Sequence, residues 1–408
     1  MSRKELDRSK IMEQIRQRQI SKIEGSRRLG ISRQHLDRLY KRFCKEGDKG
    51  LVSKRRGQPS NNRLPNVVRE AISKIIKEHY PDFGPTFANE KLKEAHGFEV
   101  SNETVRQIMI RAGIWKGKHR KHPKVHQMRL RRPSRGELIQ IDGSPHDWFE
   151  RRRESCCLLV LIDDASSEIM GLRFVENECL QGYFDLVRSY IKSHGRPLAF
   201  YSDRHTIFHV PEVEATSGTG VTQFSRAMSA LDIEVIPANS PQAKGRVERC
   251  NGTLQDRLTK EMRLAKINDI ETANAWLPQF IQKHNKRFAV APLSPVDAHR
   301  EGLPSATDLD HIFSLQYQRK LTKNLEISYK NVIYQVQTQS PSYRMRGAYI
   351  TVCERLHEVI LLYNNKRLDY KTFDKHNRPK QPVSAKELNP HFDQRKISRK
   401  SKPKPNHP

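Results

Sequence analysis

The chain has 408 residues, enough for two or three domains that each bury a core. Its 75 Lys and Arg against 46 Asp and Glu give a net charge of +29, which indicates a polyanionic partner, with nucleic acid as the first candidate. No apolar run approaches the length of a membrane-spanning helix and no signal-like segment is found, so we expect a soluble intracellular protein with no membrane partner.

Residues 1–52 carry a helix-turn-helix pattern. In "SKIEGSRRLGISRQHLDRLYKRF", Leu29 closes one amphipathic helix and Gly30 begins the turn. Ser32 is placed to cap the next helix. The outward face of that helix carries residue types that contact bases and phosphates in a major groove, namely Arg33, Gln34, Arg38 and Lys41. The pattern favours DNA binding, and the alternative is a helical hairpin with a solvated basic face.

A second, weaker module of this kind is expected at residues 66–115. The basic, Pro-containing sequence "KRRGQPSNNRLP" indicates a linker before it, at residues 53–65. Ser101 can cap a helix whose apolar side faces a core, while Asn102 and Arg106 lie outside and are candidate DNA contacts. The alternative is a purely structural helical domain.

Residues 116–135 form a basic linker with nine Lys or Arg and no acid. Such a run cannot pack, so we expect it to lie along phosphates or to stay disordered. Its three histidines do not indicate a zinc site, because no cysteine or second ligand pair lies nearby. The six cysteines of the chain form no C-x-x-C pair, so reduced thiols are expected rather than disulfides.

Residues 136–290 alternate short apolar runs with helical ones, which predicts a mixed α/β domain. The expected order is three strands, a helix, a strand, a helix, a strand and a helix. "ELIQID" is predicted as a first strand that ends at Asp142, and "PLAFYSD" as a later strand that ends at Asp203. "CCLLVLIDDAS" predicts a strand buried on both faces, paired as a hairpin with "SEIMGLRFVEN".

Three acids in this region suggest a metal site. Asp142 and Asp203 are each predicted at the carboxyl end of a strand, where open α/β folds gather their chemistry. Glu248 lies beside the apolar stripe of the last helix and could point at these strand ends. Three carboxylates without thiols favour Mg²⁺ or Mn²⁺.

Each acid also has a plainer explanation. Glu248 would be stabilised by the helix dipole in any case, and Asp203 could be a turn residue. Asp163 and Asp164 also follow a strand, but "DDASSE" is typical of a hairpin turn. We therefore expect replacement of Asp163 or Asp164 by Asn to cost much less activity than replacement of the other three acids.

Several segments together resemble the DDE transposases of bacterial insertion sequences, most closely the ISNCY-like group. These segments are "LIQIDGSPHDWF", "LIDDASSEIMGLRF", "FYSDRHTIF", "TQFSRAMSALDIEVIPANSPQAKGRVERCNGTLQDRL" and "HNKRFAVAPLSPVDAHR". The resemblance covers about residues 15–370, and "NSPQAKGRVER" is its most specific part. Because that group belongs to the retroviral-integrase superfamily, the resemblance implies an α/β RNase H-like catalytic core, a mixed sheet with helices, between helix-turn-helix modules and a small β domain.

The resemblance implies that Asp142, Asp203 and Glu248 are the catalytic acids and hold two Mg²⁺ or Mn²⁺ ions. Residues 204–247 separate the second acid from the third, a longer interval than in the best-known integrases, and a loop after Asp203 accounts for the excess. Lys244, Arg246 and Arg249 would face the phosphate backbone. The implied reaction is transposition, a form of DNA recombination and integration: hydrolysis frees the 3′ ends of the element, and these ends attack target DNA directly.

Residues 291–375 alternate as in a small antiparallel β domain, which the resemblance suggests is barrel-like. Residues 376–408 are rich in Pro and Lys, as in a disordered basic tail. The expected partners are the terminal repeats of the element and target DNA, bound by a homo-oligomer at the bacterial nucleoid in the cytoplasm. Two alternatives are a DNA-binding regulator that retains an inactive transposase core, and an RNase H-like metal-dependent nuclease.

Overall fold

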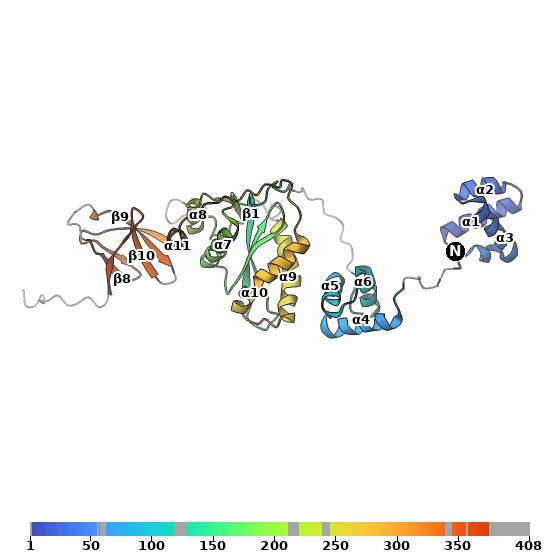
Figure 1. Ribbon diagram of the computed structural model, residues 1–408, viewed down its shortest axis with the longest axis horizontal. Coiled ribbons are helices and arrows are strands. Elements are labelled where there is room, and N and C mark those ends of the chain that lie inside the picture. Colours follow the sequence, from blue (N-terminus) through green and yellow to red (C-terminus); the bar gives the residue numbers. More distant parts are fainter. Residues whose placement is uncertain are drawn as a thin grey trace, which may run out of the picture. The chain divides into compact units, whose positions relative to one another are not determined.

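The computed structural model describes residues 2–54, 57, 63–117, 129–210, 220–238, 245–338, 345–355 and 358–374. Lys244 and the predicted basic tail lie outside these residues, as do most of the basic linker and most of the loop after Asp203. The chain divides into two compact units, residues 1–124 and residues 125–408. The first unit consists of helices, and the second contains helices and sheets (Figure 1).

The first unit begins with a three-helix module made of α1 (Arg3–Arg16), α2 (Lys22–Leu29) and α3 (Arg33–Glu46), closed by the short 3-10 helix η1 (Gly47–Leu51). Its core is formed by Met12, Ile15, Leu36, Leu39, Phe43 and Leu51. Gly30 ends α2 in the left-handed conformation, at φ 59°, and the Ser32 hydroxyl accepts from the His35 amide to cap α3. The predicted helix-turn-helix is therefore confirmed in its turn and in its cap.

A second three-helix module follows, made of α4 (Asn66–His79), α5 (Pro85–His96) and α6 (Asn102–Arg111). Its separate core includes Ile72, Ile76, Phe83, Phe87, Leu92, Val105, Ile108 and Met109. The Ser101 hydroxyl caps α6 by accepting from the Thr104 amide at 3.1 Å, as the sequence predicts.

The second unit contains a five-stranded sheet in the order β3-β2-β1-β4-β5. The strands are β1 (Leu138–His146), β2 (Cys156–Asp163), β3 (Ile169–Val175), β4 (Ala199–Ser202) and β5 (Glu234–Pro237). The pairs β3-β2 and β2-β1 are antiparallel, and the pairs β1-β4 and β4-β5 are parallel. The chain order of strands and helices agrees with the prediction, and the mixed sheet with helices confirms the predicted class of core.

Helices cover both faces of this sheet. The side chains of Ile139, Ile141, Leu159 and Leu161 pack against α7 (Leu180–His194) and α8 (Gln223–Ser229). On the other face, side chains of β2 and β3 pack against α9 (Gly245–Leu264) and α10 (Ile270–Phe288). Because β2 lies between the two layers, all eight of its residues are buried.

The first strand is longer than predicted. The sequence suggested that it ends at Asp142, but β1 continues to His146, because the whole stretch pairs antiparallel with β2. Asp142 lies opposite Val160, in the middle of β1. The apolar strand β2 supplies a complete ladder of partners, so β1 persists through residues that have little strand propensity of their own.

After the short helix α11 (Ala306–Ile312), the second unit ends in two small antiparallel sheets. One has the order β11-β10-β9-β6, with β6 (Leu315–Lys320), β9 (Tyr349–Arg355), β10 (Glu358–Tyr363) and β11 (Lys366–Leu368). The other has the order β12-β8-β7, with β7 (Glu326–Tyr329), β8 (Val332–Val336) and β12 (Tyr370–Asp374). Both sheets share one apolar core, which includes Ile327, Val336, Val352 and Leu361. Within the part of the chain that the structure describes, none of the helices has the length and apolarity needed to cross a bilayer.

Candidate active site and nucleic-acid interface

Asp142 lies on β1, and Asp203 directly follows the neighbouring parallel strand β4. The register pairs Leu138 with Ala199 and continues to the pair Gln140 and Tyr201. Two further steps along both strands bring Asp142 opposite Asp203, the residue that directly follows β4. Neighbouring strands lie about 4.8 Å apart, and residues that share a register position point to the same face. The two carboxylates therefore start from adjacent positions on one face of the sheet.

The helix α9 runs along that same face, in step with β1. Three hydrogen bonds join every fourth residue of α9 to every second residue of β1. The Val247 amide donates to Gln140 Oε1 at 3.1 Å. Further along, Asn251 Nδ2 donates to Asp142 Oδ2 at 2.8 Å, and Gln255 Nε2 donates to Ser144 Oγ at 3.2 Å. Four helical residues rise about 6 Å and two strand residues about 6.6 Å, so the two repeats match. This alignment fixes the helix lengthwise against the strand.

Glu248 lies in the first turn of α9, one residue after Val247 and three before Asn251. Its side chain is exposed. Residues three apart on a helix share a face, so Glu248 lies on the side of α9 from which Asn251 reaches Asp142. The apolar stripe predicted beside Glu248 is present, since the four side chains Val247, Leu254, Leu258 and Met262 are fully buried.

The side chains of the three acids do not form a closed ligand set in this structure. The Asp142 carboxylate accepts from Asn251, and Asp203 Oδ1 accepts from the His205 amide at 3.0 Å. Among the described residues, no three His, Cys, Asp or Glu side chains lie close enough together to hold a metal ion. The backbone thus brings Asp142 and Asp203 side by side and places Glu248 on the helix above the same face, while the metal site itself stays a prediction.

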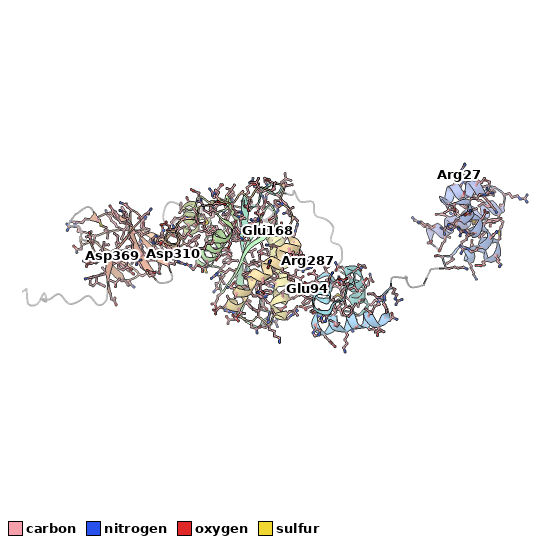
Figure 2. All side chains as sticks on the ribbon, in the orientation of Figure 1. Arg27, Glu94, Glu168, Arg287, Asp310 and Asp369 are labelled. Atoms are coloured by element: carbon pink, nitrogen blue, oxygen red, sulfur yellow. The ribbon has the colours of Figure 1, made fainter. Side chains whose placement is uncertain are left out.

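Asp164 lies in the turn between β2 and β3, as predicted, whereas Asp163 is the last residue of β2, and both side chains are fully buried. Asp163 makes the expected turn contacts: its carboxylate accepts from the Ser166 amide and hydroxyl, at 2.7 and 2.8 Å. The Asp163 amide closes the turn by donating to the carbonyl of Glu168, a residue labelled in Figure 2. Asp164 instead contacts distant segments, and its role was missed because none of its side-chain partners is close in sequence.

Arg246, which was predicted to face phosphate, is bound by other parts of the protein, and its phosphate contact stays a prediction. Its side chain is only 17% exposed, and its guanidinium donates to Asp164 Oδ1 at 2.7 Å and to the Arg129 carbonyl at 3.2 Å. Burial lowers the pKa of Arg246, with a further decrease from the neighbouring Arg129 and an opposing increase from Asp164. Arginine stays protonated at physiological pH, so the contact is a buried ion pair. Arg249 is exposed, and its phosphate contact stays a prediction.

The predicted DNA-reading face of α3 is open to solvent. All four of its residues are exposed, namely Arg33, Gln34, Arg38 and Lys41. Within residues 2–54 the structure shows ion pairs for Lys22 with Asp37 and for Arg28 with Glu24, and none for Arg33 or Arg38. These two guanidinium groups are therefore available to a polyanion.

In the second module the two predicted contacts already have partners on the protein. Arg106 donates two bonds of 2.7 Å to Glu103, which lowers the pKa of that carboxyl to about 2, and Asn102 Oδ1 accepts from Asn89 Nδ2 at 2.7 Å. A stronger candidate, missed in the sequence, is an open hollow of about 410 Å³ between α4 and the end of α6. Its lining includes four basic residues, Arg63, Arg69, Lys77 and Arg111.

Comparison with known proteins identifies the family. Over 379 residues the chain is 40% identical to a protein named "Putative transposase y4bF" from Sinorhizobium fredii, a match that covers 93% of this chain and 83% of that protein. The chain belongs to the transposase family of that protein. It is also 29% identical over 360 residues to "Transposase for insertion sequence IS1202" from Streptococcus pneumoniae, across 79% of this chain and 76% of that protein.

A family model and two solved structures also match parts of the chain. Residues 36–109, from α3 to α6, match the homeodomain-like domain family. Among solved structures, the catalytic core of an HTLV-2 integrase in complex with magnesium matches 35% of this chain and 86% of its own length at 17% identity and a TM-score of 0.26. A simian T-cell lymphotropic virus intasome matches 74% of this chain and 96% of its own length at 14% identity and a TM-score of 0.32. These scores are low, so the description of the core rests on its own strand order and helix layers.

Proposed function

We propose that the chain binds the terminal inverted repeats of its insertion sequence and catalyses metal-dependent 3′-end cleavage and strand transfer into target DNA. The observation that carries the proposal is the parallel register of β1 and β4, whose pair Gln140 and Tyr201 lies two residues before Asp142 and Asp203, together with the hydrogen bond from α9 to Asp142. Membership of the transposase family supports the reaction class. We place this activity at the nucleoid, in the cytoplasm.

The donor set fits Mg²⁺ or Mn²⁺. Asp142, Asp203 and Glu248 offer only hard carboxylate oxygens, and these cations bind such oxygens while keeping positions for water and phosphate. When bound, a pair of divalent cations would supply activation of the attacking oxygen and stabilisation of the leaving oxygen. The protein itself positions the ligands. Asn251 orients the Asp142 carboxylate, and Gln255 holds α9 against β1 by donating to Ser144, two residues further along the strand.

DNA recognition is assigned to the first unit. The exposed face of α3, with Arg33, Gln34, Arg38 and Lys41, suits base edges. The basic hollow in the second module suits phosphates, which position a protein on DNA without reading sequence. Because two element ends must be joined to one target, we propose that the chain acts as a homo-oligomer once it is bound to DNA.

The proposal is tested by incubating the purified chain with DNA from the ends of its own element, a target plasmid and Mg²⁺ or Mn²⁺. Products in which the 3′ ends of the element are joined to target DNA are expected. Cleavage without joining would instead indicate a nuclease. Bound but uncut DNA in either metal would indicate a regulator with an inactive core.

A further inference from the structure

Asp164 is the centre of a buried polar network. Its side chain is fully buried, and its Oδ1 accepts from Gln140 Nε2 and Arg246 Nη1, both at 2.7 Å, and from Arg129 Nη2. Its Oδ2 accepts from the Arg132 amide at 2.9 Å. A buried carboxylate is costly unless it is both paired and hydrogen-bonded, and Asp164 meets both conditions.

A hairpin turn does not require such a network. The neighbouring Asp163 already closes the turn through Ser166 and Glu168. The side-chain partners of Asp164 come from three other places: the strand β1, the first turn of α9 and residues 129–132. Its side chain therefore joins distant parts of the fold.

The network holds the first turn of α9 at two consecutive residues. Arg246 is held by its guanidinium on Asp164. Val247 is held by its amide, which donates to Gln140 Oε1, while the other end of the Gln140 side chain donates to Asp164. Amides in a first helical turn have no acceptor within the helix, so Gln140 acts as a cap supplied by the sheet. The next residue is Glu248.

The same network reaches the strands of the other two acids. Gln140 lies two residues before Asp142 on β1. The Arg129 guanidinium, which donates to Asp164, lies 5.6 Å from the ring centre of Tyr201, two residues before Asp203. On α9, Arg246 lies two residues before Glu248. Each of the three acids is thus preceded, two residues earlier, by a residue that contacts the network. Gln140 and Arg246 donate to Asp164 directly, and Tyr201 contacts Arg129.

We propose that Asp164 is a positioning residue, which holds the first turn of α9 against β1 and β4 so that Glu248 stands at a fixed distance from Asp142 and Asp203. This inference rests on the proposed function, because it assumes that these three acids form the active site. It assigns a structural task to the inward-facing Arg246 and to the second aspartate of "DDASSE".

The decisive variant is Arg246→Gln, which removes one member of the network and leaves the carboxylates in place. The matched control is Arg263→Gln. Arg263 lies in the last turn of the same helix, and the substitution breaks its ion pair of 3.1 Å with Glu150. Strand joining by Arg246→Gln should fall by about 10- to 100-fold, as is usual for residues that orient a metal ligand. The variant should also need a higher Mn²⁺ concentration than wild type to reach half of its maximal joining rate. Arg263→Gln should stay within about twofold of wild type.

Two further measurements distinguish a positioning role of Arg246 from a direct DNA contact and from a general loss of structure. The slope of end-binding affinity against salt should be unchanged in Arg246→Gln, because the side chain touches no phosphate. Hydrogen exchange in peptides covering residues 245–251 should become faster in Arg246→Gln and in Asp164→Asn. Arg246→Lys keeps the positive charge but cannot make the hydrogen bonds to both Asp164 and the Arg129 carbonyl. Its hydrogen-exchange rate and its strand-joining rate should therefore lie between those of Arg246→Gln and wild type.

The outcomes keep this inference apart from the proposed function. If Glu248→Gln is inactive while Arg246→Gln joins normally, with unchanged exchange at residues 245–251, the acids form the site and the positioning role is overturned. If Glu248→Gln itself joins DNA normally, the proposed site fails, and the positioning role fails with it. A melting temperature is measured for every variant. If Arg246→Gln does not fold, Arg246→Lys takes its place, and normal joining with unchanged exchange in that variant overturns the inference.

Discussion

The exposed face of α3 and the first turn of α9 use the same residue type in opposite ways. In α3, Arg33 and Arg38 point to solvent, and the helix is held by its apolar side and by the Ser32 cap. In α9, Arg246 points inward to a buried carboxylate. The basic sequence alone suggests phosphate contact for both helices. The comparison shows that burial, and not charge, decides whether an arginine is available to DNA or fixes the position of a helix.

The two arrangements also differ in what they tolerate. An exposed arginine contributes little to folding, so α3 can change its contacts without loss of structure. A buried ion pair is costly to break, because one charge is then left without its partner. A substitution in the first turn of α9 should therefore change both the stability of the fold and the positions of the three acids.

Asp164→Asn should reduce the free energy of unfolding by about 3 to 5 kcal/mol, because two guanidinium groups lose their buried counter-charge. The turn context alone predicts only a small loss of activity, whereas the buried contacts of Asp164 predict this loss of stability. Denaturant unfolding of the full chain measures it. The control is Glu103→Gln, which breaks an exposed pair with Arg106 and should leave the transition unchanged. Equal transitions in the two variants would contradict the account.

Changing Arg33 and Arg38 together to Ala should weaken binding to the element end, by about 1 to 3 kcal/mol for each base-specific interaction that the substitution removes. Binding to unrelated DNA should fall less. Titration by mobility shift on both DNAs measures this, with Arg28→Ala as the control, since Arg28 is exposed but paired with Glu24 on α2. Equal decreases on both DNAs would mean that α3 touches phosphate only.

His284 extends the contrast to pH. Burial lowers the pKa of His284 to about 4, and neither ring nitrogen has a hydrogen-bond partner among the described residues. Between its unfolded pKa of about 6.5 and its folded value, only the unfolded chain takes up the proton, so stability is lost as pH falls through this window. From pH 7 to pH 5 the loss should be about 1 to 2 kcal/mol.

His284→Phe should remove this acid sensitivity, because the side chain already packs between Phe280 and Phe288. Calorimetric melting of the full chain at pH 7 and pH 5 measures the effect. The variant should lose less melting temperature than wild type between the two pH values. An equal loss would show that His284 does not take up the proton on unfolding.

The basic hollow in the second module should give the smallest change. Replacing Arg69 and Arg111 by Ala should flatten the plot of log affinity against log salt by about one unit for each phosphate that the protein no longer neutralises. Affinity should fall about equally on element-end and unrelated DNA, unlike the result expected for the α3 variants. A slope that does not change would remove this hollow from the DNA-binding surface.

Sequence patterns predicted those features that depend on local periodicity. The stripe of α9 follows from helical spacing, and the hairpin of β2 and β3 from two apolar runs around a polar turn. The end of β1 was not predictable in this way, because Gly143 and Ser144 extend the strand only through pairing with β2. Strand pairing is a long-range property that local propensity does not contain.

The inward turn of Arg246 escaped prediction for the same reason. Its partner Asp164 lies 82 residues away in sequence, and nothing near either residue indicates the pairing. The second aspartate of "DDASSE" was the available signal, since one aspartate is enough to close the turn. The spacing of the three acids suggested a site, but their neighbouring placement depends on the parallel register of β1 and β4.

The most direct test of the central claim is strand joining by Glu248→Gln in Mg²⁺ and in Mn²⁺, with end binding followed in parallel. The substitution keeps size and hydrogen-bonding capacity but removes one anionic ligand, so joining should fall by at least about 1,000-fold in both metals. End binding should stay at the wild-type level or strengthen slightly, because one negative charge near phosphate is gone. Near-normal joining by Glu248→Gln, with normal end binding, would contradict the assignment of Asp142, Asp203 and Glu248 as the active site.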